Sequence, residues 1–359
     1  MQMNLKGSKY LIALFIPVFT MIGFVRGGFY ILFPLLFAFV LVPLFELVLK
    51  TEESNLKREE ALIQSENKGY DFILYLLFPI QLFALYLFLS HMALDKLPVW
   101  ERILMISAMG LNCGIIGINV GHELGHRSTK FEINLARLFL LTSLYMHFNI
   151  EHNRGHHKKV GTLEDPASAR YGENLYAFLV RSIVQSYFSA WNIENVRLKK
   201  SGIRILSFKN LMIRFQVIQL LFLLSIYFYF GGMALLCFVI AAFLGICLLE
   251  AVNYIEHYGI GRILQQNGAP EKVQHCHSWN SNHVLGRLML FELSRHSDHH
   301  YKAIKKYHLL DHHDESPQMP TGYPGMIILA LIPPLWFSLI HPILEKEKVR
   351  MPSIRLAKK

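Results

Sequence analysis

The stretch HELGHRSTKFEINLARLFLLTSLYMHFNIEHNRGHH, residues 122–157, holds two histidine motifs separated by one apolar run. Two later segments carry further histidines, and the four places together hold nine of the chain's 18 histidines. Each place follows an apolar run or lies in a charged segment, so we expect the four to converge at the edge of a membrane. The motifs are His122-Glu-Leu-Gly-His126, His152-Asn-Arg-Gly-His156-His157, Asn253-Tyr-Ile-Glu-His257-Tyr-Gly259 and Arg295-His296-Ser-Asp-His299-His300.

The composition is that of a membrane protein. Of the 359 residues, 53% are hydrophobic and only 17% are charged, whereas soluble domains have about 25% charged residues. Several apolar runs approach or exceed the roughly 20 residues that a helix needs to cross a bilayer. These runs predict an all-α integral membrane protein and disfavour the alternative, a soluble helical bundle with a large core.

The apolar runs predict about six transmembrane helices in a single membrane-embedded domain, residues 1–359. The first run follows Lys6 and Lys9. We interpret it as a retained anchor and not a signal peptide, because no small-residue cleavage site follows it and a second run starts almost at once. The predicted spans are residues 10–25, 28–49, 72–94, 103–121, 212–230 and 232–252.

Three further segments are predicted to remain outside the bilayer core. Residues 50–68 are densely charged and predict a solvated amphipathic helix. Residues 133–150 are too short and polar for a crossing, and Pro333-Pro334 interrupts the apolar residues 325–340. We expect both of these segments to lie at the interface.

The distribution of positive charge predicts the orientation. Six spans with tight hairpins leave only Arg26, Lys96 and Arg102, of 36 Lys and Arg residues, on one face. Positively charged loops face the cytoplasm, so both termini and the catalytic segments, residues 122–209 and 253–324, are predicted on the cytoplasmic side of a bacterial inner membrane. The net charge of +10 is dispersed and accompanies no recognisable nucleic-acid module, so no nucleic-acid partner is expected.

The histidine spacing predicts a metal site. Residues four apart share one face of a helix, so His122 and His126 can ligate one metal, as can His152 and His156, while His157 can reach a second. Nine imidazoles exceed the four ligands of a tetrahedral zinc site and suit two ions. Imidazole alone does not choose among Zn, Cu, Fe and Ni. The predicted ligands are His122, His126, His152, His156, His157, His257, His296, His299 and His300.

Nearby carboxylates are expected to orient these histidines and not to bind the metal, because a ligand histidine usually donates its other N–H to a carboxylate or carbonyl. These residues are Glu123, Glu151, Asp165, Glu256 and Asp298. No catalytic residue beyond the ligands is predicted. The four cysteines contain no CxxC, which argues against a disulfide framework or a fused rubredoxin-type domain. Any electron donor is therefore expected to be a separate protein.

Together, the motifs resemble the histidine boxes of the membrane desaturase and hydroxylase superfamily of non-haem di-iron enzymes. Finer features resemble one branch, the integral-membrane alkane 1-monooxygenases. Besides the four motifs above, the segments that carry this resemblance are Glu164-Asp-Pro-Ala-Ser-Ala-Arg170, His277-Ser-Trp-Asn-Ser-Asn-His283 and Pro320-Thr-Gly-Tyr-Pro324.

The resemblance implies an enzyme that inserts one atom of O2 into the terminal C–H bond of a medium-chain alkane and releases the other atom as water. It implies two iron ions at the nine histidines, with electrons from rubredoxin, which an NAD(P)H-dependent reductase would reduce. His275, His277 and His283 are not expected as ligands, and His308, His312 and His313 are expected at the surface. An apolar channel among the spans would admit the alkane from the membrane lipid.

Details depart from the family pattern at Arg127, where Lys is common, at residues 160–163, and in the Lys- and His-rich segment 301–314. These departures concern chain-length preference and donor docking.

Three alternatives remain open. His122-Glu-Leu-Gly-His126 matches the HExxH signature of zinc proteases, with Glu123 as general base, but that interpretation leaves seven clustered histidines unexplained. A metal transporter would place its ligands near the membrane midplane. A related di-iron hydroxylase or desaturase acting on aromatic methyl groups or fatty acyl chains is the serious alternative, and the Asn253–Gly259 motif favours alkanes.

Overall fold

The computed structural model describes residues 7–94, 97–263, 265–351 and 353–357. These residues are mainly helical with almost no strand, as predicted. One short antiparallel pair joins β1 (Ile260–Gly261) to β2 (Arg355–Leu356). The predicted cationic link residue Lys96 and the terminal residues 1–6 and 358–359 lie outside the described residues.

Five helical segments among the described residues are long and apolar enough to cross a membrane: Ser8–Arg26, Gly28–Glu46, Gly69–Met92, Val99–Gly125 and Leu211–His257. The chain is therefore a multi-pass membrane protein. The first segment joins η1 (Ser8–Leu14) and α1 (Phe15–Arg26), and the second joins η2 (Gly28–Leu32), α2 (Phe33–Leu36), η3 (Phe37–Leu41) and α3 (Val42–Glu46). The third is α5 (Gly69–Met92), the fourth joins α6 (Val99–Asn112), η4 (Cys113–Ile118) and α7 (Asn119–Gly125), and the fifth is α12 (Leu211–His257).

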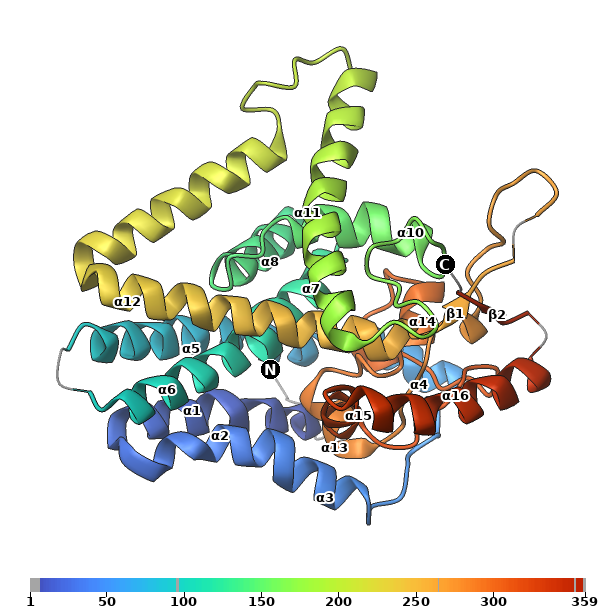
Figure 1. Cartoon of the computed structure of the whole chain (residues 1–359), viewed down its shortest axis with the longest axis horizontal. Coiled ribbons are helices and arrows are strands. Elements are labelled where there is room, and N and C mark those ends of the chain that lie inside the picture. The colour runs from blue at the N-terminus through green and yellow to red at the C-terminus, as the bar shows by residue number, and fades with distance from the viewer. Residues whose placement is uncertain (1–6, 95–96, 264, 352, 358–359) are drawn as a thin grey trace.

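The helix α12 is two spans joined by a bend. It has 47 residues, and Gly231 interrupts it with φ 87° and ψ 171°, which are not helical angles. At 1.5 Å per residue, α12 is about 70 Å long, more than twice the roughly 30 Å of a bilayer core. Figure 1 shows its two arms meeting in a V. The two arms correspond to the predicted spans 212–230 and 232–252, which brings the count to the six expected.

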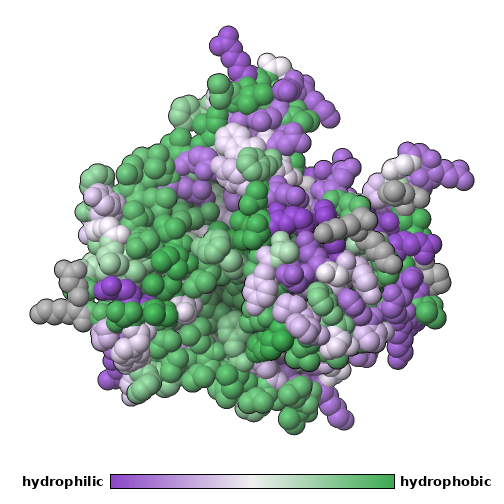
Figure 2. Space-filling view, viewed as in Figure 1, coloured by the Kyte–Doolittle hydropathy of each residue, from purple (hydrophilic) through white to green (hydrophobic). Residues whose placement is uncertain are grey.

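The apolar and polar halves of the molecule are separated along the bundle. In Figure 1 the bend of α12, the end of α5 and the start of α6 lie at one side. The helices α10 (His157–Lys159) and α14 (His296–Tyr301) and the end of α12 lie toward the other. Figure 2 shows apolar side chains over the first side and polar side chains over the second. The histidine motifs thus share the polar end of the bundle.

Two predicted interfacial segments are short helices that do not qualify as spans. Residues 130–141 form α8 (Lys130–Leu141), which begins where the Thr129 hydroxyl accepts a hydrogen bond from the Glu132 amide, a typical N-cap. Residues 325–340 divide into α15 (Tyr323–Ala330) and α16 (Pro333–Arg350). The proline pair starts α16, because proline fits the first turn of a helix, where no amide partner is needed.

The polar segments differ from expectation in two places. Only Arg58–Ser65 of the charged segment 50–68 is helical (α4), because the Glu52 amide bonds instead to the Asn282 carbonyl and holds that part of the chain extended. The predicted catalytic segment 122–209, for which no long helix was expected after residue 150, contains the 26-residue helix α11 (Leu175–Lys200), which Asn174 caps. The remaining elements are α9 (Phe148–Glu151), η5 (His152–His156), η6 (His275–His277), α13 (Val284–Met289) and η7 (Tyr307–Leu309).

Glycines allow the fourth span to pack closely against the second arm of α12. A Cβ atom built on Gly245 would lie 2.5 Å from the Cβ of Cys113 and 2.9 Å from the Gly114 amide nitrogen. The two backbones therefore touch, and any side chain at Gly245 would separate them. This contact fixes the position of α7 relative to the end of α12, and so the position of His122 relative to His257.

We expect Gly245→Ala to lower the free energy of unfolding by about 1–3 kcal/mol, the usual cost of overpacking, because the new methyl group has no space. Thermal unfolding of the protein in nanodiscs measures this loss. Gly232→Ala is the matched control, because its Cβ would meet only Tyr227 Cε2, at 3.7 Å. Equal stability of the two variants would contradict the close packing.

Candidate metal centre

The structure brings all nine predicted ligand histidines together in two groups. One group contains His122, His126, His152, His157 and His299, and the other contains His156, His257, His296 and His300. Within each group the ligand nitrogens all lie within 4.8 Å of one another. Since α7, η5, α10, α12 and α14 all contribute, the groups exist only in the assembled fold.

The predicted pairing of His152 with His156 is wrong. The structure places His152 in the first group and His156 in the second. The reason is local: residues 152–156 form the π-helix η5, whose wider turn removes the α-helical alignment of residues four apart. His152 instead meets His157, five residues on, with 3.0 Å between their Nε2 atoms.

The contacts between the imidazoles fit a bound cation. In the second group, Nε2 of His300 lies 3.2 Å from Nε2 of His156 and 2.9 Å from that of His296. Each imidazole nitrogen carries either one proton or one lone pair, so His300 can complete only one of these contacts as a hydrogen bond. Nitrogens that bind a common ion at about 2.0–2.1 Å would lie about 3 Å apart, which agrees with the observed spacing.

Of the seven histidines outside the membrane-spanning segments, burial lowers the pKa of six and so favours the neutral form that binds metals; His156 is the exception. His257 and His156 are fully buried, whereas His126 and His157 are half-buried and bring the first group nearest to solvent. Burial, together with the neighbouring His156, lowers the pKa of His299 to about 3. A protonated imidazole has no free lone pair on nitrogen, so the depressed pKa favours the ligand form.

Asp165 orients His156. Its Oδ2 lies 2.8 Å from His156 Nδ1 and also accepts a hydrogen bond from the Ser168 hydroxyl at 2.6 Å. Burial lowers the pKa of His156, but the charge and hydrogen bond of Asp165 outweigh it and raise that pKa above its usual value. The carboxylate thus fixes the Nδ1–H tautomer and leaves Nε2 free to face the group.

Glu256 contacts the Nε2 atom of His296, whereas Asp165 contacts the Nδ1 atom of His156. Oε2 of Glu256 lies 3.2 Å from Nε2 of His296, on the side where the group converges, and its Oε1 accepts a hydrogen bond from the Tyr323 hydroxyl at 2.7 Å. A carboxylate oxygen that could bind a metal therefore lies beside the nitrogens of the second group, and the hydrogen bond from Tyr323 holds this carboxylate in place.

The other three predicted carboxylates have different partners. Glu123 Oε1 accepts hydrogen bonds from Arg127 at 2.7 Å and from the Tyr307 amide at 3.2 Å. Burial raises the pKa of Glu151 to about 8, and its Oε1 contacts the Ser189 hydroxyl. Asp298 accepts from Lys305 and from the Asp311 amide.

Sequence reasoning missed Glu250, a fully buried carboxylate one turn before Asn253. Its oxygens accept hydrogen bonds from Tyr145 at 2.8 Å and Ser182 at 2.5 Å. The network ties α12 to α11 and to the turn before α9. The sequence did carry a signal for Glu250: it is an acidic residue inside the predicted span 232–252, and such residues are costly in a membrane and usually functional.

The remaining histidines lie apart from the two groups. His277 accepts a hydrogen bond from the Gln274 amide, His283 contacts Ser281, and His308 stacks on Tyr70. His308 was expected at the surface but is buried. His275 and His313 form a third group with Asp298.

Comparisons with known proteins agree with this arrangement. The fatty acid desaturase family model matches residues 97–330. Alkane 1-monooxygenase 1 of Pseudomonas aeruginosa is 43% identical over 67% of this chain and 63% of its own length. Alkane 1-monooxygenase 2 of the same organism is 39% identical over 85% and 81%. The hydroxylase component of xylene/toluene monooxygenase of Pseudomonas putida is 31% identical over 63% and 60%.

We expect Asp165→Asn to weaken metal binding by the second group about 10- to 100-fold, because it removes the charge that orients His156. Bound metal, counted after dialysis against a chelator, should fall from two ions per chain toward one. Glu164→Gln is the control, since the Glu164 side chain is 76% exposed and pairs with Lys159. Equal metal retention by both variants would contradict the role of Asp165.

Proposed function

Because the chain belongs to the alkane 1-monooxygenase family within the fatty acid desaturases, and is by that membership an oxidoreductase, we propose that it hydroxylates the terminal carbon of medium-chain n-alkanes. The observation that carries this proposal is the pair of imidazole groups at the polar end of a membrane bundle (Figure 2). A small apolar cavity adjoins them through Tyr323, which lines it and bonds to Glu256 beside His296. One oxygen atom of O2 enters the C–H bond and the other leaves as water, which consumes two electrons and two protons.

The two histidine groups are proposed to hold two iron ions. Five nitrogens in one group and four in the other suit imidazole-binding transition metals, and the family resemblance selects iron among them. Iron bound there would supply the oxidising chemistry that O2 activation requires. The chain's own contribution is to favour the neutral form of imidazoles such as His299 by burial, to orient His156 through Asp165, and to hold Glu256 beside His296.

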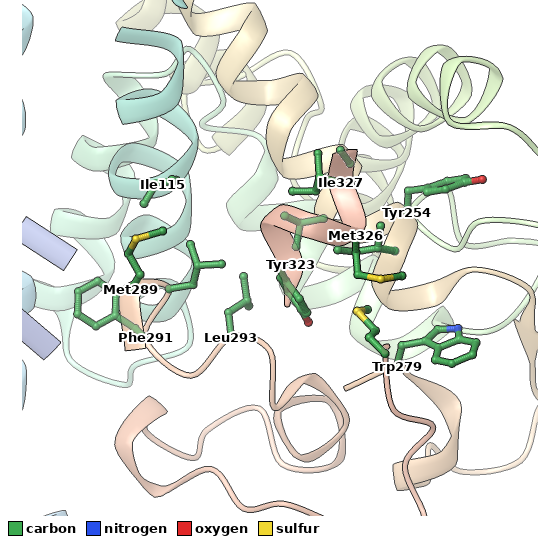
Figure 3. Packing of buried hydrophobic residues seen from close by; sticks show 14 of the residues in the cluster. Ile115, Tyr254, Trp279, Met289, Phe291, Leu293, Tyr323, Met326 and Ile327 are labelled. Atoms are coloured by element: carbon green, nitrogen blue, oxygen red, sulfur yellow. The ribbon is translucent and has the colours of Figure 1, made fainter. Parts of the chain in front are cut away.

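A small apolar cavity of about 30 Å³ is proposed to mark the route of the substrate. It lies between the second span, η4, α12, α13 and α15, and its lining ends at Tyr323, whose hydroxyl bonds to Glu256. Figure 3 shows Ile115 and Met289 on one side, with Tyr323 and Ile327 on the other. An alkane has no polar handle, so each buried methylene, at about 0.8 kcal/mol, must supply its recognition. The cavity lining is Ala38, Phe39, Ile115, Leu248, Val252, Met289, Leu290, Tyr323, Pro324 and Ile327.

The geometry disfavours the protease alternative. In that reaction Glu123 would act as a general base on metal-bound water. Here Arg127 and the Tyr307 amide hold its Oε1, as part of a buried ion-pair network with Asp71. A related enzyme acting on aromatic methyl groups or fatty acyl chains remains the alternative, because the hydroxylase component of xylene/toluene monooxygenase is 31% identical over 63% of this chain.

The electron donor is proposed to be rubredoxin, reduced by an NAD(P)H-dependent reductase. The half-buried His126 and His157 are where the first group approaches the surface, and Lys158 and Lys159 follow directly. Basic residues beside this opening would steer an acidic donor. We further propose that residues 122–209 and 253–324 form one catalytic cap on the cytoplasmic side of a bacterial inner membrane.

Iron content and product identity test the proposal together. We expect purified protein in nanodiscs to contain about two irons per chain. With reduced rubredoxin, its reductase, NADH and O2, it should convert octane and dodecane to primary alkanols. Iron with only methylbenzyl alcohol from xylene would select the alternative substrate. Zinc in place of iron, with no oxygenated product, would refute the hydroxylase.

The cavity makes a prediction about chain length. Ala38 is buried and lines the cavity, so Ala38→Leu should exclude about two methylenes of a long substrate. The ratio of dodecane to octane hydroxylation should then fall about tenfold, from about 0.8 kcal/mol per methylene. Val40→Phe, on the exposed face of the same span, is the control. If the ratio does not change while iron content is normal, the cavity is not the substrate path.

A further inference from the structure

A third group of metal-ligating side chains lies apart from the nine histidines. It contains His275, Asp298 and His313, whose ligand atoms also lie within 4.8 Å of one another. His275 belongs to η6, Asp298 to α14, and His313 to the Lys- and His-rich segment 301–314, which departs from the family pattern. The proposed hydroxylation uses none of the three.

The distances are close to those of a coordination site. Oδ1 of Asp298 lies 3.1 Å from Nε2 of His313 and 3.7 Å from Nε2 of His275. Ligands about 2.0–2.2 Å from one zinc ion in tetrahedral geometry would be about 3.3–3.5 Å apart. Nε2 of His275 is buried and has no hydrogen-bond partner among the described residues.

The two oxygens of Asp298 have separate environments. Oδ2 accepts hydrogen bonds from the Lys305 ammonium and the Asp311 amide, at 2.6 and 2.8 Å. These two donors fix the carboxylate, so Oδ1 is presented to both imidazoles. The Lys305 ammonium would also repel a metal ion bound at Oδ1. We therefore expect a moderate affinity for the metal, weaker than that of a structural site with four ligands.

We propose that His275, Asp298 and His313 bind one divalent transition-metal ion of the zinc class, separate from the two groups of the metal centre. Two imidazoles and one carboxylate suit zinc and its neighbours, whereas Mg²⁺ and Ca²⁺ prefer all-oxygen sites. Three protein ligands leave a position open for water. This inference does not depend on which metal the nine histidines hold.

Binding requires a small movement of one ring. The His275 and His313 rings are stacked, with centroids 3.6 Å apart and planes at 13°, whereas two ligand rings must both point their edges at the ion. His313 has room to tilt, because its side chain is 26% exposed and borders a cavity of about 550 Å³. The ion would thus replace a stacking contact with two metal–nitrogen bonds.

The position of Asp298 gives the site a consequence for the metal centre. Asp298 lies on α14 between His296 and His299, which belong to different groups. An ion at the third site would tie this short helix to η6 and to the segment 301–314. Occupancy should therefore stabilise the helix that supplies three of the nine imidazoles.

The test is a zinc titration of the iron-loaded protein in nanodiscs, with zinc and iron counted in the same dialysed sample. The wild type should gain one zinc per chain and keep all of its iron, and its unfolding temperature should rise. His275→Ala and His313→Ala should each weaken zinc binding at least tenfold and lose the temperature shift. His312→Ala is the control, because His312 pairs with Asp314 instead.

Three outcomes would overturn the inference: a wild type that gains no zinc, a zinc gained only as iron is lost, or a His313→Ala variant that binds zinc as the wild type does. Failure of the alkane assay would leave the zinc count unaffected. The two proposals therefore fail separately.

Discussion

The structure depends on burying imidazole nitrogens that face one another. Nε2 atoms about 3 Å apart cannot all be satisfied by hydrogen bonds among themselves, because each carries a single proton or lone pair. Such an arrangement is costly in a buried site unless a cation occupies its centre. The surrounding structure meets the requirements of this arrangement. Asp165 selects the tautomer of His156, burial favours the neutral form of rings such as His299, and five helical elements bring the nitrogens together.

The membrane bundle supplies the rigidity for that convergence. Gly245 allows the second arm of α12 to touch the fourth span through its backbone, so α7 and the end of α12 reach the polar end at a fixed separation. Glu250 then ties α12 to Tyr145 and Ser182. Tyr323 lines the apolar cavity between the spans and donates a hydrogen bond to Glu256, so the packing that positions the imidazoles also places this cavity near the second group.

Much of this arrangement could be predicted from sequence because its signals are local. Apolar runs gave the spans, and histidine spacing gave the nine residues that the structure gathers. The division into groups could not be predicted, because it depends on the π-helical turn at residues 152–156, which has no clear sequence signature. Helix α11 was missed because its polar residues hid the pattern, although Asn174 is a typical cap. His275, Asp298 and His313 are far apart in sequence, so only the fold shows that they meet.

The π-helix η5 supplies one histidine to each group. The helix α14 also contributes to both, with His299 in the first group and His296 and His300 in the second. An ion entering either group must therefore order backbone that the other group also uses. The conformational entropy of that ordering is lost once, with the first ion, and the second ion binds to segments already fixed. If both groups hold an ion, we therefore expect the two positions to be loaded with positive cooperativity.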